Sequence, residues 1–222
     1  MSLRPGMVWW RLKDFLAELQ GGSTHRRSVF RRIHDGNLWG DAESVSGPGS
    51  SLAATAAVRR ELPALMARHG CRSLLDAPCG DCRWISELFP CFEHYHGVDI
   101  VPELVAAHQA RWGNECVAFS CLDLASDPLP KADLILCRDC FIHLPTRQIR
   151  AVLANFKASG ATFLLLTSDH GAAAYEDIPL GSFRPIDFEE PPFSFPHPLD
   201  EIAEGSAGRT LCLWRLTDVP ER

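Results

Sequence analysis

Short apolar runs alternate with longer amphipathic segments from residue 72 onward. The apolar runs predict strands at Ser73–Asp76, Tyr95–Asp99, Cys116–Ser120, Asp133–Cys137, Thr162–Thr167 and Leu211–Leu216. Helical periodicity fills most of the gaps between them, at Asp81–Leu88, Pro102–Trp112 and Thr146–Ser159. Because buried strands that alternate with helices form parallel sheets, we expect a doubly wound, mostly parallel α/β sheet. Its ligand should lie at the carboxyl ends of the strands.

The N-terminal part of the chain follows other patterns. A helix is predicted over residues 8–19, because apolar residues recur there at helical spacing: Val8, Leu12, Phe15, Leu16 and Leu19. Residues 25–34 predict a second short helix. The stretch Trp39–Ser51 is rich in Gly and Ser, which is typical of turns, and its serines are suited to cap a helix that continues to Arg68.

These patterns divide the chain into an N-terminal helical extension with a Gly/Ser-rich loop (1–50) and a main domain (51–222). The total formal charge is −6, but residues 1–34 carry seven basic and two acidic side chains, so the rest stands at −11. This balance disfavours general nucleic-acid binding, which needs clustered cations. The basic run Thr24–His34 fits a solvated helix face better than a site for a polyanion or an acidic partner.

Composition and segment lengths favour a cytoplasmic protein. Hydrophobic residues make up 46% of the chain and charged residues 23%, as in ordinary globular domains. No run approaches the ~20 apolar residues of a membrane span, and the N-terminus lacks the apolar core of a signal peptide. The nine cysteines are an odd number scattered through apolar segments, which favours reduced thiols over a disulfide framework.

Polar residues gather where the predicted strands end. The first strand reads Ser73-Leu-Leu-Asp76 and continues through a tight turn at Gly80, where an unhindered backbone lets a nucleoside ligand approach. Asp99 ends the second strand, 23 residues after Asp76, and a carboxylate at this place accepts hydrogen bonds from ribose hydroxyls. Asp123 follows the third strand.

Four segments together carry a family resemblance: LLDAPCGDCRW, YHGVDIVPELV, FSCLDLASDPLP and ADLILCRDCFIHLP. In order and spacing they resemble the cofactor motifs of class I S-adenosylmethionine-dependent methyltransferases, over about residues 50–168. The resemblance implies an enzyme with the seven-stranded Rossmann-like methyltransferase fold and S-adenosylmethionine as its cofactor. The turn departs from the family pattern, because Pro78 and Cys82 stand where glycines are common, and Pro78 removes a backbone donor.

The resemblance also implies roles for individual residues. Asp76, Cys79 and Gly80 would surround the methionine part of the cofactor, and Asp99 would hold the ribose. Ile100 would pack on the adenine, and Asp123, with Leu124 beside it, would accept from the adenine amino group. Arg138 and Asp139 would face the methyl-transfer centre, and Arg138 is expected either to pair with Asp139 or to hold the cofactor carboxylate. Asp99 has an alternative interpretation as the capping acid of the helix that begins at Pro102.

Three residues are candidates for acid–base catalysis: Asp139, His143 and His170. Each has a structural alternative. Asp139 has Arg138 and Arg147 as potential ion-pair partners, and the two histidines have packing and hydrogen bonding as alternative roles.

The two CxxC units, Cys79–Cys82 and Cys137–Cys140, lie on neighbouring predicted strands, which raises a Cys₄ metal or redox site as an alternative. They coincide with the expected cofactor site, so we expect buried thiols without metal. The stretch Ser44–Ser51 has two interpretations of equal weight: a plain turn and cap, or a set of amides that holds the cofactor carboxylate.

The acceptor is expected to be a small or medium molecule, and a sugar or natural-product hydroxyl is the first hypothesis. The irregular region Gly181–Leu199 is long for a connector and is expected to line or close the site, and Arg184, Phe193, Phe195 and Trp214 are its candidate contacts. A non-catalytic S-adenosylmethionine-binding or scaffold protein on the same fold is the main alternative. The oligomeric state does not follow from the sequence.

Overall fold

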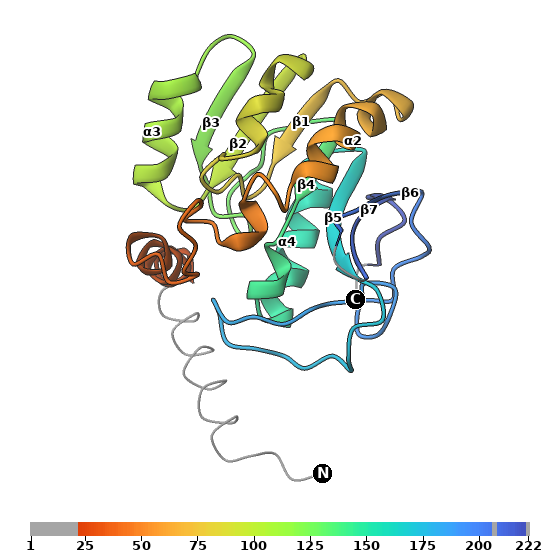
Figure 1. Cartoon of the computed structure of the whole chain (residues 1–222). Helices are drawn as coiled ribbons and strands as arrows, with labels where there is room; N and C mark the ends of the chain where they lie inside the picture. Colours follow the sequence, from red (N-terminus) through yellow and green to blue (C-terminus); the bar gives the residue numbers. More distant parts are fainter. Residues whose placement is uncertain (1–21, 206–207, 221–222) are drawn as a thin grey trace.

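The computed structural model describes residues 22–205 and 208–220, and Figure 1 shows a central sheet flanked by helices. The strands are β1 (Ser73–Asp76), β2 (His94–Asp99), β3 (Val117–Cys121), β4 (Leu134–Cys137), β5 (Phe163–Asp169), β6 (Asp200–Ala203) and β7 (Arg209–Arg215). Their order is β3-β2-β1-β4-β5-β7-β6; β7 runs antiparallel to β5 and β6, and β1 to β5 pair in parallel. This confirms the predicted doubly wound, mostly parallel seven-stranded sheet.

The strand order creates a crevice at the end of β1. The chain moves outward from β1 through β2 to β3 and then returns to β4 on the other side of β1. Asp76, the last residue of β1, pairs with Gly97 of β2 and Leu136 of β4. Ligands of open α/β sheets bind at such a switch point, outside the carboxyl ends of the strands.

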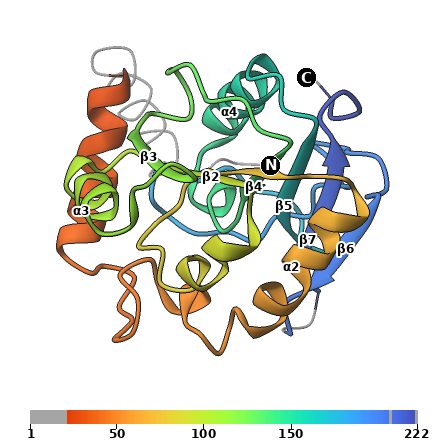
Figure 2. The same cartoon turned by 90° about the horizontal axis from the view of Figure 1, so that it is seen from above.

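Each face of the sheet has its own apolar core. The helices α2 (Ala56–Arg68) and α3 (Pro102–Trp112) and the 3₁₀ helix η2 (Ile85–Cys91) cover one face. The helix α4 (Thr146–Ala158) covers the opposite face, as Figure 2 shows, together with aromatic residues of the loop that follows β5. It packs with one stripe at helical spacing, formed by Ile149, Val152, Leu153 and Phe156.

Three local predictions were wrong. No α-helix spans Asp81–Leu88: Cys82 has a left-handed backbone (φ 55°) that an α-helix does not accommodate, and only the 3₁₀ helix η2 follows. The helix expected from the serines begins at Ala56, because Ser51 first accepts turn hydrogen bonds from Ala54 and Thr55. The edge strand β6 was missed, since Ile202 is its only buried residue.

The N-terminal helix is described over residues 22–35 and lies at the carboxyl ends of β2 and β3 (Figure 1). Two of its basic residues form ion pairs with the main domain. Arg26 forms a buried ion pair with Asp123, and Arg31 forms an exposed ion pair with Glu103 of α3. The basic run is thus not simply a solvated face. The helix predicted over 8–19 lies outside the described residues, and the division at residue 50 stays a prediction.

Candidate active site

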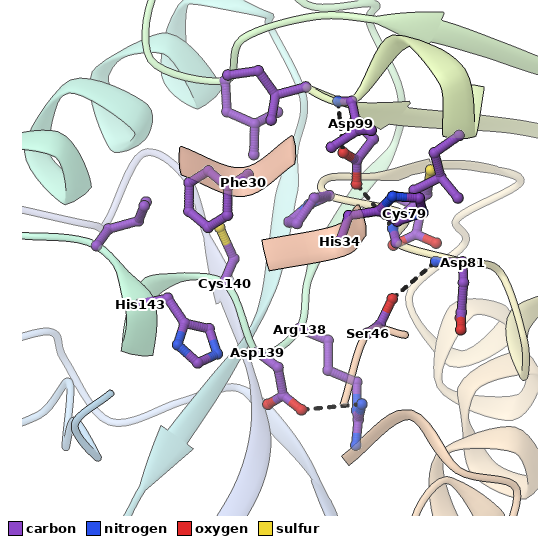
Figure 3. Close-up of a pocket in the computed structure, with 18 of the residues that line it drawn as sticks. Phe30, His34, Ser46, Cys79, Asp81, Asp99, Arg138, Asp139, Cys140 and His143 are labelled. Atoms are coloured by element: carbon purple, nitrogen blue, oxygen red, sulfur yellow. Dashed lines mark hydrogen bonds and ion pairs between the residues drawn. The ribbon is translucent and has the colours of Figure 1, made fainter. Parts of the chain in front are cut away.

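One pocket lies across the carboxyl ends of β1 to β4, with an empty volume of about 1140 Å³ including its solvent-open part. Its walls contain every residue predicted to bind cofactor: Asp76, Cys79, Gly80, Asp99, Ile100, Asp123, Leu124 and Arg138. Two of the three catalytic candidates, Asp139 and His143, also line it (Figure 3). The N-terminal helix and the following loop close it. Arg26, Phe30, His34 and Trp39 were not singled out as site residues by the sequence, whereas Val45, Ser46 and Ser50 belong to the stretch Ser44–Ser51 that it had raised as one alternative.

The turn after β1 is held from several sides. The Gly80 N–H donates to Oδ2 of Asp99 at 3.2 Å, and the Cys79 N–H donates to the carbonyl of Val98. Gly80 has φ +53°, and a Cβ atom there would lie 2.5 Å from Oγ of Ser46. Only glycine therefore suits this turn.

The carboxyl group of Asp76 is almost completely buried. The Tyr95 hydroxyl donates to its Oδ2 at 2.8 Å. Burial raises its pKa well above the usual value, and the nearby Cys82 and Asp99 add to this, against the Tyr95 hydrogen bond and the charge of Arg138. The group therefore favours a cationic partner on its pocket side.

The carboxylate of Asp99 accepts hydrogen bonds from two backbone N–H groups. Its Oδ1 accepts from Val101, the residue before α3, at 3.0 Å, and its Oδ2 accepts from Gly80; no described side chain caps α3. Burial raises its pKa, and these amides oppose the shift. Each carboxylate oxygen accepts more than one hydrogen bond, so Asp99 retains capacity for hydroxyl donors in the pocket.

Asp123 is bound from the N-terminal helix. Nε of Arg26 donates to both carboxylate oxygens, at 3.1 and 2.9 Å, and the side chains of the pair are 9% and 2% exposed. Burial raises the pKa of Asp123, but Arg26 and the N–H of Ala125 outweigh it and hold the pKa below its usual value. The pair places a guanidinium in the pocket wall next to Leu124, which the motif pattern did not predict.

The Gly/Ser-rich loop is attached to the turn after β1. Oγ of Ser44 donates to the carboxylate of Asp81 at 2.7 Å, and Oγ of Ser46 accepts from the N–H of Asp81 at 2.9 Å (Figure 3). The loop thus closes the side of the pocket near Gly80. Neither of its two sequence interpretations is tested by these contacts.

Arg138 and Asp139 belong to a network of four charges. Nε of Arg138 donates to Glu204 at 2.6 Å, and its Nη2 donates to the carbonyl of Gly49. Asp139 lies between Arg138, at 3.2 Å, and Arg209, and it also accepts from the hydroxyl of Thr167. A carboxylate between two guanidinium groups is a weak base. Of the two arginines that the sequence offered as ion-pair partners of Asp139, namely Arg138 and Arg147, the structure shows the pair with Arg138.

His143 lines the pocket, and one of its ring nitrogens is hydrogen-bonded to the backbone. Its Nδ1 donates to the carbonyl of Ser182 at 2.8 Å, which leaves the lone pair on Nε2. Burial lowers the pKa of His143, and the charge of Arg184 lowers it further, against the Ser182 hydrogen bond. The ring stacks on Trp39 with centroids 4.7 Å apart. His143 is therefore a neutral, oriented base at neutral pH.

His170 does not line the pocket. Its ring nitrogens face other groups: Glu189 at 3.6 Å, Glu201 at 3.4 Å and the thiol of Cys212 at 3.5 Å. The irregular region after β5 also differs from expectation. Its residues do not line the pocket, and Phe193, Phe195 and Trp214 pack in the core. The region reaches the site through His143: the Ser182 carbonyl accepts from its Nδ1, and the ring of Phe183 lies 6.0 Å from its ring.

The cysteine pairs do not form one four-thiol cluster within the described residues. Cys79 and Cys82 lie near His108, whose Nε2 is 2.8 Å from the carbonyl of Gly80. Hydrogen bonding from the Cys79 thiol and the neighbouring His108 lower the pKa of Cys82 to about 6, against the effect of burial. Cys137 packs in the core of the opposite face.

Comparisons with known proteins agree with this geometry. Residues 75–159 match a family model described as a methyltransferase domain. A solved structure with similar fold is 1,6-didemethyltoxoflavin-N1-methyltransferase of Burkholderia thailandensis, with S-adenosylhomocysteine bound; it is 18% identical, with a TM-score of 0.55, and the match covers 97% of this chain and 91% of that one. No curated protein matches the chain.

Two more distant structures also match. Magnesium protoporphyrin IX methyltransferase of Synechocystis is 17% identical, with a TM-score of 0.48, over 64% of this chain and 72% of that one. The methyltransferase domain of bacterial CtHen1 is 15% identical, with a TM-score of 0.46, over 52% of this chain and 66% of that one.

Residues 75–159 thus match a methyltransferase domain, as the motifs predicted, and the strand order is that of the predicted Rossmann-like methyltransferase fold. Both findings agree with the prediction of an S-adenosylmethionine-dependent methyltransferase. The site fits this cofactor: buried carboxylates stand at the ends of three adjacent strands, and one pocket connects them with the tight turn at Gly80. In the described part of the chain, no helix is both long and apolar enough to cross a bilayer.

Proposed function

We propose that the protein methylates a hydroxyl group of a small or medium acceptor, such as a natural product, with His143 as the base. The observation that carries this proposal is the tautomer of His143, a pocket-lining residue whose Nδ1 donates to Ser182, so that the lone pair lies on Nε2. S-adenosylmethionine supplies the electrophilic methyl group when bound. An oriented base supports a hydroxyl acceptor, because a hydroxyl must lose its proton, whereas an amine or thiolate needs little help.

The other residues of the site have supporting roles. Asp76, Asp99 and the turn at Gly80 hold the cofactor, and Ile100 and Leu124 pack on its adenine. Asp139, tied to Arg138 and Arg209, keeps the end of β4 rigid beside His143. The Arg26–Asp123 pair and Trp39 close the pocket and exclude water from the reacting groups.

The pH dependence of the reaction tests the proposed base. Burial and Arg184 lower the pKa of His143, so its neutral form persists below the ordinary histidine value of about 6.5. The acidic limb of kcat/KM should therefore have its midpoint below about pH 6.5. Initial rates from pH 4.5 to 8, with cofactor binding measured at each pH, check this expectation. A midpoint above that of free histidine would contradict the proposal.

Asp76 is expected to bind the amino group of the cofactor's methionine part. In the Asp76→Asn variant, affinity for S-adenosylhomocysteine should fall about tenfold or more, because a charge-assisted hydrogen bond is lost. The free protein should be as stable as the wild type or more stable. The raised pKa means that ionised Asp76 destabilises the fold above the unfolded pKa, and asparagine carries no such charge.

Titration calorimetry and thermal unfolding measure the two effects separately. Asp76→Ala is the comparison variant, since it also removes the acceptor of the Tyr95 hydroxyl and should lose stability. Unchanged affinity in Asp76→Asn would remove this residue from the cofactor site.

A further inference from the structure

The ring of His143 contacts two other aromatic side chains. Trp39 stacks on it with centroids 4.7 Å apart and planes inclined by 24°, and the Phe183 ring is tilted against it with centroids 6.0 Å apart. Trp39 comes from the loop after the N-terminal helix and Phe183 from the loop after β5, so neither belongs to the sheet that holds the cofactor motifs. The candidate base is thus surrounded by aromatic surface from two separate loops.

Phe183 is unusual because it is 62% exposed, although its neighbour Arg184 is buried. Within the described residues, only three large hydrophobic side chains are exposed, namely Leu38, Phe183 and Leu199. Two of these three are close to this group of rings. Leu38 precedes Trp39 in the sequence, and the ring of Phe183 contacts that of His143. Exposed apolar surface concentrated beside a pocket is typical of a ligand contact.

The polar groups around His143 are already engaged. The Nδ1 of His143 donates a hydrogen bond to the Ser182 carbonyl, and the carboxylate of Asp139 forms ion pairs with Arg138 and Arg209. The pocket wall also contains Phe30, Cys140, Leu144 and Val152, with the polar Gln148 among them. A sugar would lose water from several hydroxyl groups here and gain few protein partners, which is costly.

The acidity of the acceptor's hydroxyl group also favours an aromatic acceptor over a sugar. A phenolic hydroxyl has a pKa of about 10, much closer to that of an imidazole than the hydroxyl of a saturated alcohol. A single neutral histidine, with no carboxylate behind its Nδ1, therefore suits a phenol as its proton donor.

We propose that the acceptor is a phenol, an aromatic ring that packs against Trp39 and Phe183 and presents its hydroxyl to Nε2 of His143. This inference rests on the proposed methyl transfer to a hydroxyl. The oxygen–methyl bond forms as the sulfur–methyl bond breaks, the phenolic proton passes to Nε2 of His143, and the sulfur leaves as a neutral thioether. The imidazolium then releases its proton to water.

A matched pair of acceptors tests the proposal. Wild-type protein with isotopically labelled S-adenosylmethionine is given 4-methylphenol, 4-methylcyclohexanol, glucose or benzylamine, and labelled products are measured by mass spectrometry. We expect methylation of the phenol at a rate at least about tenfold above that of the other three. Preference for the saturated alcohol, the sugar or the amine overturns the phenol inference. Calorimetry with S-adenosylhomocysteine tests the proposed function separately, because absence of cofactor binding contradicts that function itself.

Variants locate the subsite. Trp39→Ala and Phe183→Ala should each raise KM for the phenol about tenfold with kcat changed less than about threefold, and Trp39→Phe should restore KM. Leu199→Ala, which removes an exposed apolar side chain far in sequence from Trp39 and outside the ring contacts of His143, is the matched control. Saturation-transfer NMR with S-adenosylhomocysteine present measures phenol binding even without turnover. No phenol binding, or equal binding to wild type and Trp39→Ala, overturns the proposal.

Discussion

Replacing His143 with alanine is expected to reduce the turnover number of methyl transfer by about 10²-fold or more, the usual scale for a lost acid–base group. Affinity for the cofactor should change less than about threefold, because the side chain acts mainly in the transition state. The physical reason is the oriented neutral ring: Ser182 holds Nδ1, so Nε2 is available to take the hydroxyl proton. Steady-state kinetics on the true acceptor and calorimetry with S-adenosylhomocysteine measure the two quantities.

Two further variants make this result specific. His170→Ala removes a histidine outside the pocket and should leave turnover within about threefold of the wild type. Asp139→Asn should have a smaller effect than His143→Ala, since Arg138 and Arg209 already engage this carboxylate. Full turnover in His143→Ala, or loss of activity in His170→Ala alone, would place the base elsewhere.

The second large effect is expected in Asp99→Ala, where affinity for S-adenosylhomocysteine should fall by about tenfold to several hundredfold. The carboxylate supplies one or two charge-assisted hydrogen bonds to ribose, roughly 1.5–3 kcal/mol each. It also accepts from Gly80 and Val101, so its removal leaves the tight turn and the start of α3 less ordered. Titration calorimetry checks the affinity, and circular dichroism checks that the fold is retained.

Asp133→Ala is the matched control for this variant. Its carboxylate also accepts backbone N–H groups, those of Arg72 and Ser73, but at the opposite edge of the sheet, where β1 begins. This variant should lose stability with little change in affinity. Equal loss of affinity in both variants would mean that Asp99 acts through the fold and does not contact the ribose.

Much of the fold was predictable because its signals are local. The strand β1 and the helix α3 have the predicted bounds, and β3 is displaced by one residue. These segments combine a clear apolar period with Gly, Pro or Asp at their ends. The edge strand β6 has no such signal: it buries Ile202 and exists because β7 offers an unpaired edge.

Only part of the candidate site was predictable from the sequence, for the same reason. Asp76, Gly80 and Asp99 were predictable because they lie in short motifs at strand ends, where the sheet itself brings them together. The contributions of Arg26, Trp39 and the Ser182 carbonyl were not, because each lies far in sequence from its partner and none belongs to a motif. The motif pattern could not distinguish among the three catalytic candidates Asp139, His143 and His170. The hydrogen-bond and ion-pair partners of each side chain distinguish them, and these partners are visible only in the folded structure.

The sequence by itself thus determined the doubly wound sheet through its local periodicity, and the resemblance of its strand-end motifs to a known family implied the class of enzyme and the cofactor. Only the tertiary structure decided that Arg26 binds Asp123, that two arginines hold Asp139, and that the Nδ1 of His143 is bound by Ser182 while Trp39 stacks on its ring. These arrangements depend on long-range packing of the N-terminal helix and the loop after β5 onto the end of the sheet, and no local pattern encodes such contacts.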